Sequence, residues 1–161
     1  MKNIQRISLI VLTLTTAFLA VPVITQATDT ATDWNRKTCE IVTDGGLPTP
    51  PANRVMALVH TSIYEAVNAI TKRYPASGLL IDASAVASVD AAIASAARAS
   101  LLKLIPTQEK AIRAAYEAAL AKIADGPARS DGIAVGEKAA AAVLALRAID
   151  GASVVETYRP Y

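Results

Sequence analysis

The side chains most able to do chemistry are few, and the single histidine limits them most. His60 is the only imidazole in the chain, so any mechanism or metal site that needs two imidazoles is excluded. On a helical wheel it lies at the border of an apolar arc, on the side of Tyr64. A histidine at such an edge either makes a structural hydrogen bond or acts as a general base. We expect the structural hydrogen bond.

The neighbouring polar residues match no catalytic motif. Ser62 lacks the G-x-S-x-G turn that exposes an activated serine, and Glu65 does not complete a zinc-binding helix motif. Gly45-Gly46 lacks the lysine and the following serine or threonine of a phosphate-binding loop. The residues therefore indicate no reaction, and we predict no catalytic, cofactor-binding or metal-binding residue in this chain.

One charged residue interrupts an apolar pattern. Arg147 falls within the apolar stripe of a helix predicted over residues 130–149. A buried guanidinium needs a carboxylate or several carbonyl groups to offset its desolvation. We expect an ion pair with Glu65, with Asp150 or with a partner protein; a ligand-binding role is the alternative.

The N-terminal segment has the layout of a secretory signal. Two basic residues precede a mostly apolar run over residues 9–24, and small residues follow up to Ala27. A retained membrane anchor is the alternative, but the run is short for a bilayer span, Pro22 interrupts it and no basic cluster follows. We therefore predict that residues 1–27 are a cleaved signal peptide and that the protein is exported, to the periplasm or outside the cell.

Composition limits the partners and cross-links of the mature chain. Loss of residues 1–27 removes two basic side chains and no acidic one, which leaves 14 of each. A neutral chain without a basic stripe gives no reason to expect nucleic-acid binding, and we expect no membrane association after cleavage. Cys39 is the only cysteine, so no internal disulfide can form. It is either a small buried hydrophobe, which we expect, or a thiol that pairs between chains.

Residues 28–51 are predicted to be a leader to the main helices. A brief helix begins near Asp33 and ends at Gly45-Gly46, because paired glycines favour a turn. The Pro-rich stretch over residues 47–51 follows as a stiff connector, and its last prolines suit a helix entrance.

Residues 52–161 are predicted to form an all-α bundle of about four main helices. Apolar side chains recur at helical spacing over about 52–71, 86–105, Thr107–Ile123 and 130–149. Thr107 is the expected N-cap of the third helix. No segment shows the period-2 alternation of a β-strand.

Alanine dominates the predicted inward faces, and Trp34 is the only tryptophan. Small side chains bury little apolar area each, so such a core gains most when helices approach closely or further protein covers them. Gly132 and Gly136 form a small-xxx-small pattern that allows close approach of helix backbones. We predict tight packing of this helix inside the bundle.

Several segments, taken in order, resemble one known family. PANR at 51–54, ALVH at 57–60 and IYEAVNAI at 63–70 together resemble the first long helix of secreted bacterial vanadium-dependent haloperoxidase-like proteins. These belong to the type 2 phosphatidic acid phosphatase superfamily. Similar stretches follow at 101–106, 115–126, 135–151 and 157–160. The resemblance runs from Trp34 to the end of the chain.

The resemblance implies an activity whose residues this chain lacks. The family holds vanadate, or phosphate in its phosphatases, with K-x6-R-P, P-S-G-H and S-R-x5-H motifs, and it implies peroxide-dependent oxidation of bromide or chloride, or acid phosphatase activity. Arg159-Pro160 resembles one fragment, but Ala152 stands where the lysine belongs, and no P-S-G-H occurs. No family catalytic residue can be assigned, so vanadate is expected only in a full-length relative.

Three hypotheses follow. We favour the helical N-terminal portion of a haloperoxidase-like exported protein, inactive alone, because the sequence ends at Tyr161, about where the catalytic half should begin. Its partner would be that missing C-terminal half, or a second copy held through apolar helix faces. The second hypothesis is a free-standing exported helical module, and the third is a small enzyme built around His60, Tyr64 and Arg147.

Overall fold

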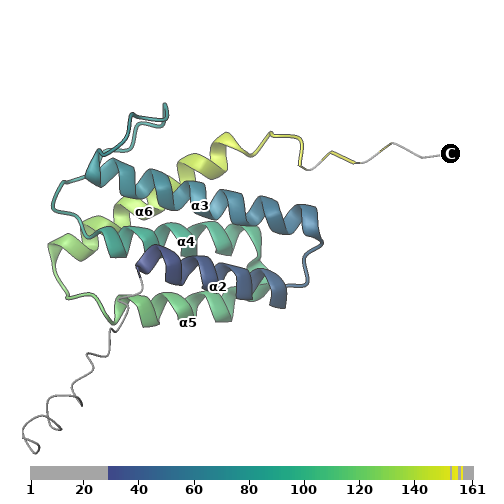
Figure 1. The fold of residues 1–161 in the computed structure, drawn as a ribbon, viewed down its shortest axis with the longest axis horizontal. Helices are drawn as coiled ribbons and strands as arrows, with labels where there is room; N and C mark the ends of the chain where they lie inside the picture. Colours follow the sequence, from purple (N-terminus) through teal and green to yellow (C-terminus); the bar gives the residue numbers. More distant parts are fainter. Residues whose placement is uncertain (1–28, 153, 156, 158–161) are drawn as a thin grey trace, which may run out of the picture.

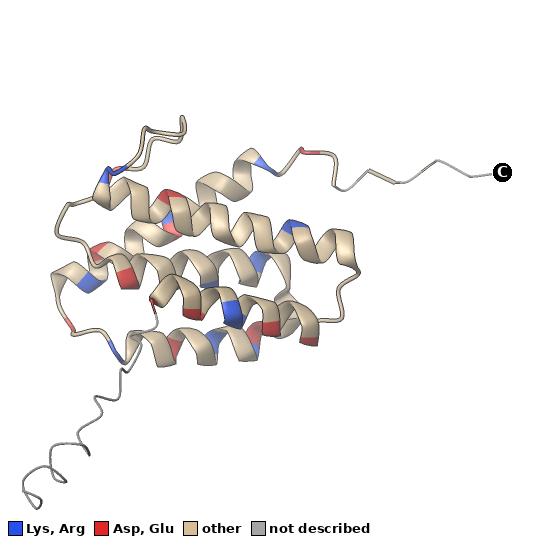
Figure 2. Cartoon of the chain, viewed as in Figure 1, with Lys and Arg blue, Asp and Glu red and all other residues tan. Residues whose placement is uncertain are grey.

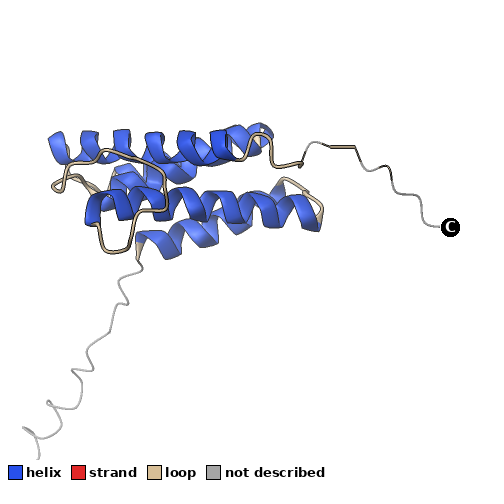
Figure 3. Ribbon diagram, turned by 90° about the horizontal axis from the view of Figure 1, so that it is seen from above, coloured by secondary structure: helices blue, strands red, loops and turns tan. Residues whose placement is uncertain are grey.

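The computed structural model describes residues 29–152, 154, 155 and 157. Five α-helices and one 3-10 turn make up their regular structure, and these residues contain no strand (Figure 3). The all-α prediction is therefore confirmed for this part of the chain. The predicted signal peptide, residues 1–27, and all of the 157–160 motif except Thr157 lie outside the described residues.

Helix α2 (Thr30–Asp44) begins earlier than the brief helix predicted from Asp33. Asp29 caps it, because its carboxylate accepts a hydrogen bond from the amide of Ala31 at 3.3 Å. The helix ends at Gly45-Gly46, as predicted, and Gly46 has a positive φ of 64°. It buries Trp34, Thr38, Ile41 and Val42. Since α2 packs against α3 and α4, its apolar side belongs to the same core as theirs.

Helix α3 (Thr49–Thr71) begins in the Pro-rich connector. Two prolines occupy its first turn, where a missing amide proton costs no helical hydrogen bond, as the sequence predicted. It ends at Thr71 because Lys72 adopts the left-handed conformation, with a φ of 50°, while its amide still donates to the carbonyl of Asn68.

The remaining helices differ from the prediction mainly at their ends. The bounds are α4 Val89–Leu104, the 3-10 turn Pro106–Gln108, α5 Glu109–Leu120 and α6 Pro127–Leu146. The start of α4 is set by Ser88, whose hydroxyl accepts from the amide of Ala91 at 3.2 Å. The prediction of Thr107 as an N-cap is wrong, because it lies within the 3-10 turn. Helix α6 starts at Pro127 rather than at residue 130 and stops short of residue 149.

Helix α4 lies at the centre of the bundle and contacts each of the other four helices. Figure 1 shows it between α3 on one side and α2 and α5 on the other. Residues 91–97 are all buried, so this helix has no solvent face over nearly two turns. The prediction of one inward face was therefore incomplete. Alanine and serine side chains permit this arrangement, since neighbours can approach a small side chain from every direction.

Helices α4 and α6 make the closest contact. A Cβ atom on Gly132 would overlap the carbonyl oxygen of Ser88, and one on Gly136 would overlap the hydroxyl of Ser95 and the carbonyl of Ala92. The predicted tight packing at the small-xxx-small pattern is confirmed.

Candidate functional site

His60 connects α3 to α2. It is half-buried, and its Nε2 lies 2.9 Å from Oδ1 of Asn35. The structural hydrogen bond expected for His60, at the border of the apolar arc of its helix, is therefore present. Tyr64 is exposed, and its ring contacts that of Tyr74, with 6.1 Å between the centroids.

Arg147 is exposed, so the prediction of a buried guanidinium is wrong. Helix α6 ends at Leu146, and the chain leaves the helical path before Arg147 can continue the apolar stripe. Its expected partner Asp150 pairs instead with Arg54, at 3.0 Å, and Arg54 also donates to the carbonyl of Arg147 at 3.1 Å. The hydrogen bond from the amide of Ala152 lowers the pKa of Asp150, and Arg54 adds to the effect.

The guanidinium that enters the bundle is that of Arg98 on α4, which the sequence pattern did not single out. Its side chain is 20% exposed and pairs with Glu137 of α6. It lies over the ring of Tyr116 on α5, 4.4 Å from the centroid, and its Nε is buried without a hydrogen-bond partner. Burial raises the pKa of Tyr116 in spite of the adjacent cation. The ring face and the carboxylate together offset the desolvation of the guanidinium.

Ser62 has a structural role. It is fully buried, as is Ser100 on α4. Its hydroxyl donates to the carbonyl of Leu58 at 2.8 Å and accepts from the hydroxyl of Ser100 at 3.0 Å. A hydroxyl enclosed in this way joins α3 to α4 and faces no pocket.

Cys39 is exposed, so the prediction of a buried thiol is wrong. Helix α2 turns Thr38 and Val42 into the core, four residues apart on one face, and Cys39 follows Thr38 on the outward side. The thiol is therefore open to pairing with another chain.

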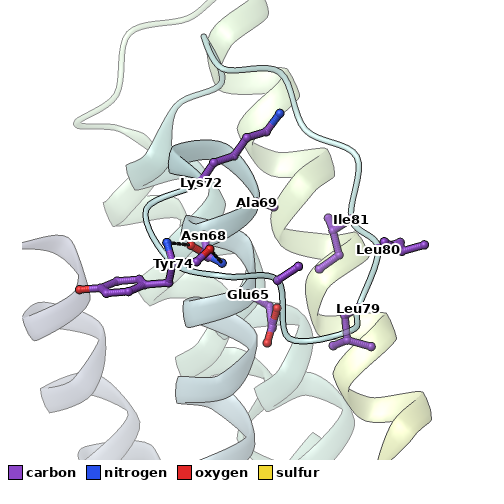
Figure 4. A pocket seen from close by; sticks show the side chains of 9 residues that line it. Glu65, Asn68, Ala69, Lys72, Tyr74, Leu79, Leu80 and Ile81 are labelled. Atoms are coloured by element: carbon purple, nitrogen blue, oxygen red, sulfur yellow. Dashed lines mark hydrogen bonds between the residues drawn. The ribbon is translucent and has the colours of Figure 1, made fainter.

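A pocket of about 320 Å³ lies where α3 meets the loop that follows it. Asn68 builds it by accepting a hydrogen bond from the amide of Tyr74 at 2.9 Å and donating to the carbonyl of the same residue at 3.1 Å. These bonds hold the loop over the end of the helix, as Figure 4 shows. Glu65 faces the pocket, and Leu79 and Ile81 form part of its apolar wall. The helical periodicity of α3 could not indicate this site, because six of its nine lining residues follow the helix.

A second pocket, of about 470 Å³, is lined by residues of α2, α4 and α5. It contains both signs of charge. Arg36 pairs with Asp33 at 2.9 Å, and Lys37 pairs with Glu40. Two of its cations are therefore already neutralised, and the pocket does not resemble an oxyanion cradle.

The described residues contain no group of three histidine, cysteine, aspartate or glutamate side chains placed to hold a metal ion. None of their helices has the length and apolar character needed to cross a membrane. No protein-family model, curated protein or solved structure matches the chain. The structure thus defines a class by its architecture alone: an all-α bundle around a central alanine-rich helix.

Proposed function

We propose that this chain is the helical scaffold of an exported vanadium-dependent haloperoxidase-like protein of the type 2 phosphatidic acid phosphatase superfamily. In this proposal a catalytic helical half docks on the chain, which has no turnover of its own. The ordered resemblance of its segments to that family supports the assignment. The observation that carries it is an apolar surface on α6.

The outer face of α6, defined here by Ala141, Ala145, Leu146 and the following Ile149, is exposed and apolar. Leu146 is 60% exposed and Ile149 is 94% exposed. No charged residue occurs between Lys138 and Arg147, which Figure 2 shows as an uninterrupted tan stretch at the end of the helix. A surface helix usually carries polar residues on its solvent side, so an apolar outer face marks a contact with further protein.

The opposite side of the bundle has the character of a solvent face. Helices α2 and α5 both carry charged residues of each sign, as Figure 2 shows. Arg36 pairs there with Asp33 at 2.9 Å, and Arg113 pairs with Glu109 at 2.6 Å. These exposed pairs favour hydration of that side over a protein contact. The partner is therefore assigned to the α6 side.

The composition of the α6 surface indicates what kind of partner would bind there. Methyl groups of alanine leave shallow depressions between turns, which suit the side chains of a second helix better than an extended peptide. A free-standing export module that binds another helical protein would use the same surface. The genomic sequence after the codon for Tyr161 separates the two: a downstream P-S-G-H motif in any frame supports the haloperoxidase-like scaffold, and its absence supports the module.

Sedimentation velocity of purified residues 28–161 tests the docking surface. Without its partner the wild-type chain should self-associate with rising concentration, because water-exposed apolar area favours contact. A double variant, Leu146→Glu with Ile149→Glu, should remain monomeric. Val86→Glu is the matched control, since Val86 is 76% exposed but precedes α4. A wild-type chain that is monomeric at every concentration, or equal effects of the double variant and the control, would contradict the proposal.

A further inference from the structure

Glu65 is an acidic side chain buried without a partner. It is only 6% exposed, and no hydrogen bond or ion pair joins its carboxyl group to the described residues. Its carboxyl oxygens are nevertheless open to the solvent in the pocket, since the enclosed side-chain polar atom that lacks a partner among the described residues is Nε of Arg98. Its carboxyl oxygens face the pocket at the end of α3, as Figure 4 shows. A donor for Glu65 can therefore come from a molecule in that pocket.

The shape of the pocket is fixed before a ligand arrives. Both polar atoms of the Asn68 amide are used to hold the backbone of Tyr74, so the loop stays in place over the helix. Because the amide is already satisfied, Glu65 is the acidic group in the lining that can accept a hydrogen bond from a ligand. The rest of the lining includes Ala69, Leu79 and Ile81, which offer only apolar contact through their side chains.

The one cation on the rim does not neutralise Glu65. Lys72 also lines the pocket, but no ion pair forms between them. It stands seven residues further along the chain, about 10 Å along a helix axis. A positive charge beside Glu65 can then be supplied by a bound ligand. A metal ion would find one carboxylate here, whereas calcium and magnesium sites need several oxygen ligands.

We propose that this pocket binds a small primary ammonium compound. The ammonium group donates to the carboxylate of Glu65, and a short hydrocarbon chain lies against Leu79 and Ile81. The volume of about 320 Å³ is at the lower limit for small-molecule sites, which favours a compact ligand. This site is independent of the docking surface on α6.

Butylammonium is the probe, and 1-butanol and butyrate are its neutral and anionic counterparts. Titration of the mature chain, followed by NMR shifts of the Ala69 and Ile81 amides, should give saturable binding of butylammonium in the millimolar range. Glu65→Gln should weaken binding at least about tenfold, because the charge is lost while the shape is kept. Lys72→Met is the control and should not weaken binding. The far-ultraviolet circular dichroism of each variant verifies its fold.

Several results would overturn this assignment. They are the absence of saturable binding to the folded wild-type chain, equal affinity for butylammonium and 1-butanol, preference for butyrate, or unchanged affinity in Glu65→Gln. The lysine side chain of a second polypeptide offers the same ammonium group. Tighter binding of Nα-acetyl-lysinamide than of butylammonium would assign the ligand to a polypeptide, and weaker binding would assign it to a free amine; both support the site.

Discussion

Ser95 of α4 lies directly against Gly136 of α6, at a place where no side chain fits between the two backbones. The hydroxyl of Ser95 also donates to the carbonyl of Ile133 on α6, at 3.0 Å. The contact therefore combines close packing with a hydrogen bond between helices. It allows an alanine-rich helix to lie at the centre of five, since small side chains contribute little burial unless their neighbours are close.

Gly136→Ala should destabilise the fold by about 1–3 kcal/mol, because the added methyl group forces the two helices apart. Helix propensity alone predicts the opposite, a gain of about 1 kcal/mol. Urea unfolding monitored by circular dichroism measures the difference. Lys138→Ala, at an exposed position of the same helix, is the control and should change little. Equal or greater stability of Gly136→Ala would show that the helices can separate freely.

The buried pair Ser62 and Ser100 should give non-additive effects. Ser62→Ala leaves the hydroxyl of Ser100 without its acceptor and should cost about 1–3 kcal/mol, whereas Ser100→Ala should cost about 0.5–1.5 kcal/mol. The double variant should lose less than the sum of the two, because no buried donor remains unpaired. Thermal unfolding of the four proteins completes the cycle. Additive losses would mean that the two hydroxyls do not interact.

Helical periodicity predicted α3 well because its apolar residues are large. Val59, Ile63 and Ile70 define its buried side, and they are buried as expected. Periodicity described α4 only in part, since an alanine can be buried or exposed on a helix and the pattern does not distinguish the two. The central position of α4 is determined by its packing against the other four helices, which local periodicity does not predict.

Arg147 and Arg98 show where helical periodicity mispredicts the burial of a charged side chain. Arg147 was assigned to the core by extending the α6 pattern past its true end at Leu146. Arg98 was not singled out, although it pairs with Glu137 and lies over Tyr116. A long cationic side chain reaches an aromatic ring on another helix, and such a contact has no signature in local spacing.

The hydrogen bond from the Ala152 amide to Asp150, together with the Arg54–Asp150 pair, predicts a pH dependence at the end of α6. The folded-state pKa of Asp150 lies below its ordinary 3.8, so its stabilising contribution is present above that pH and is lost as the pH falls through the folded-state pKa. Arg54→Met should raise this pKa but not restore it fully, because the amide of Ala152 still donates to the carboxylate. A carbon NMR titration of the Asp150 carboxyl group measures both midpoints. An unchanged midpoint in the variant would contradict a role for Arg54.

The exposed thiol of Cys39 should cross-link two chains under oxidising conditions. Non-reducing electrophoresis after mild oxidation should show a dimer that disappears on reduction, and Cys39→Ser should remain monomeric. The substitution should change stability by less than about 0.5 kcal/mol, because the side chain lies outside the core. Failure of the wild-type thiol to cross-link would mean that another part of the protein covers it.

Vanadate binding tests most directly the claim that this chain is a scaffold without an oxyanion site of its own. Purified residues 28–161 are titrated with vanadate and followed by vanadium NMR, and the same sample is assayed for bromide oxidation with hydrogen peroxide. The account predicts an unchanged vanadate resonance and no turnover, since His60 is the only histidine and its Nε2 is bonded to Asn35. A stoichiometric bound resonance with turnover, both lost in His60→Ala, would contradict it.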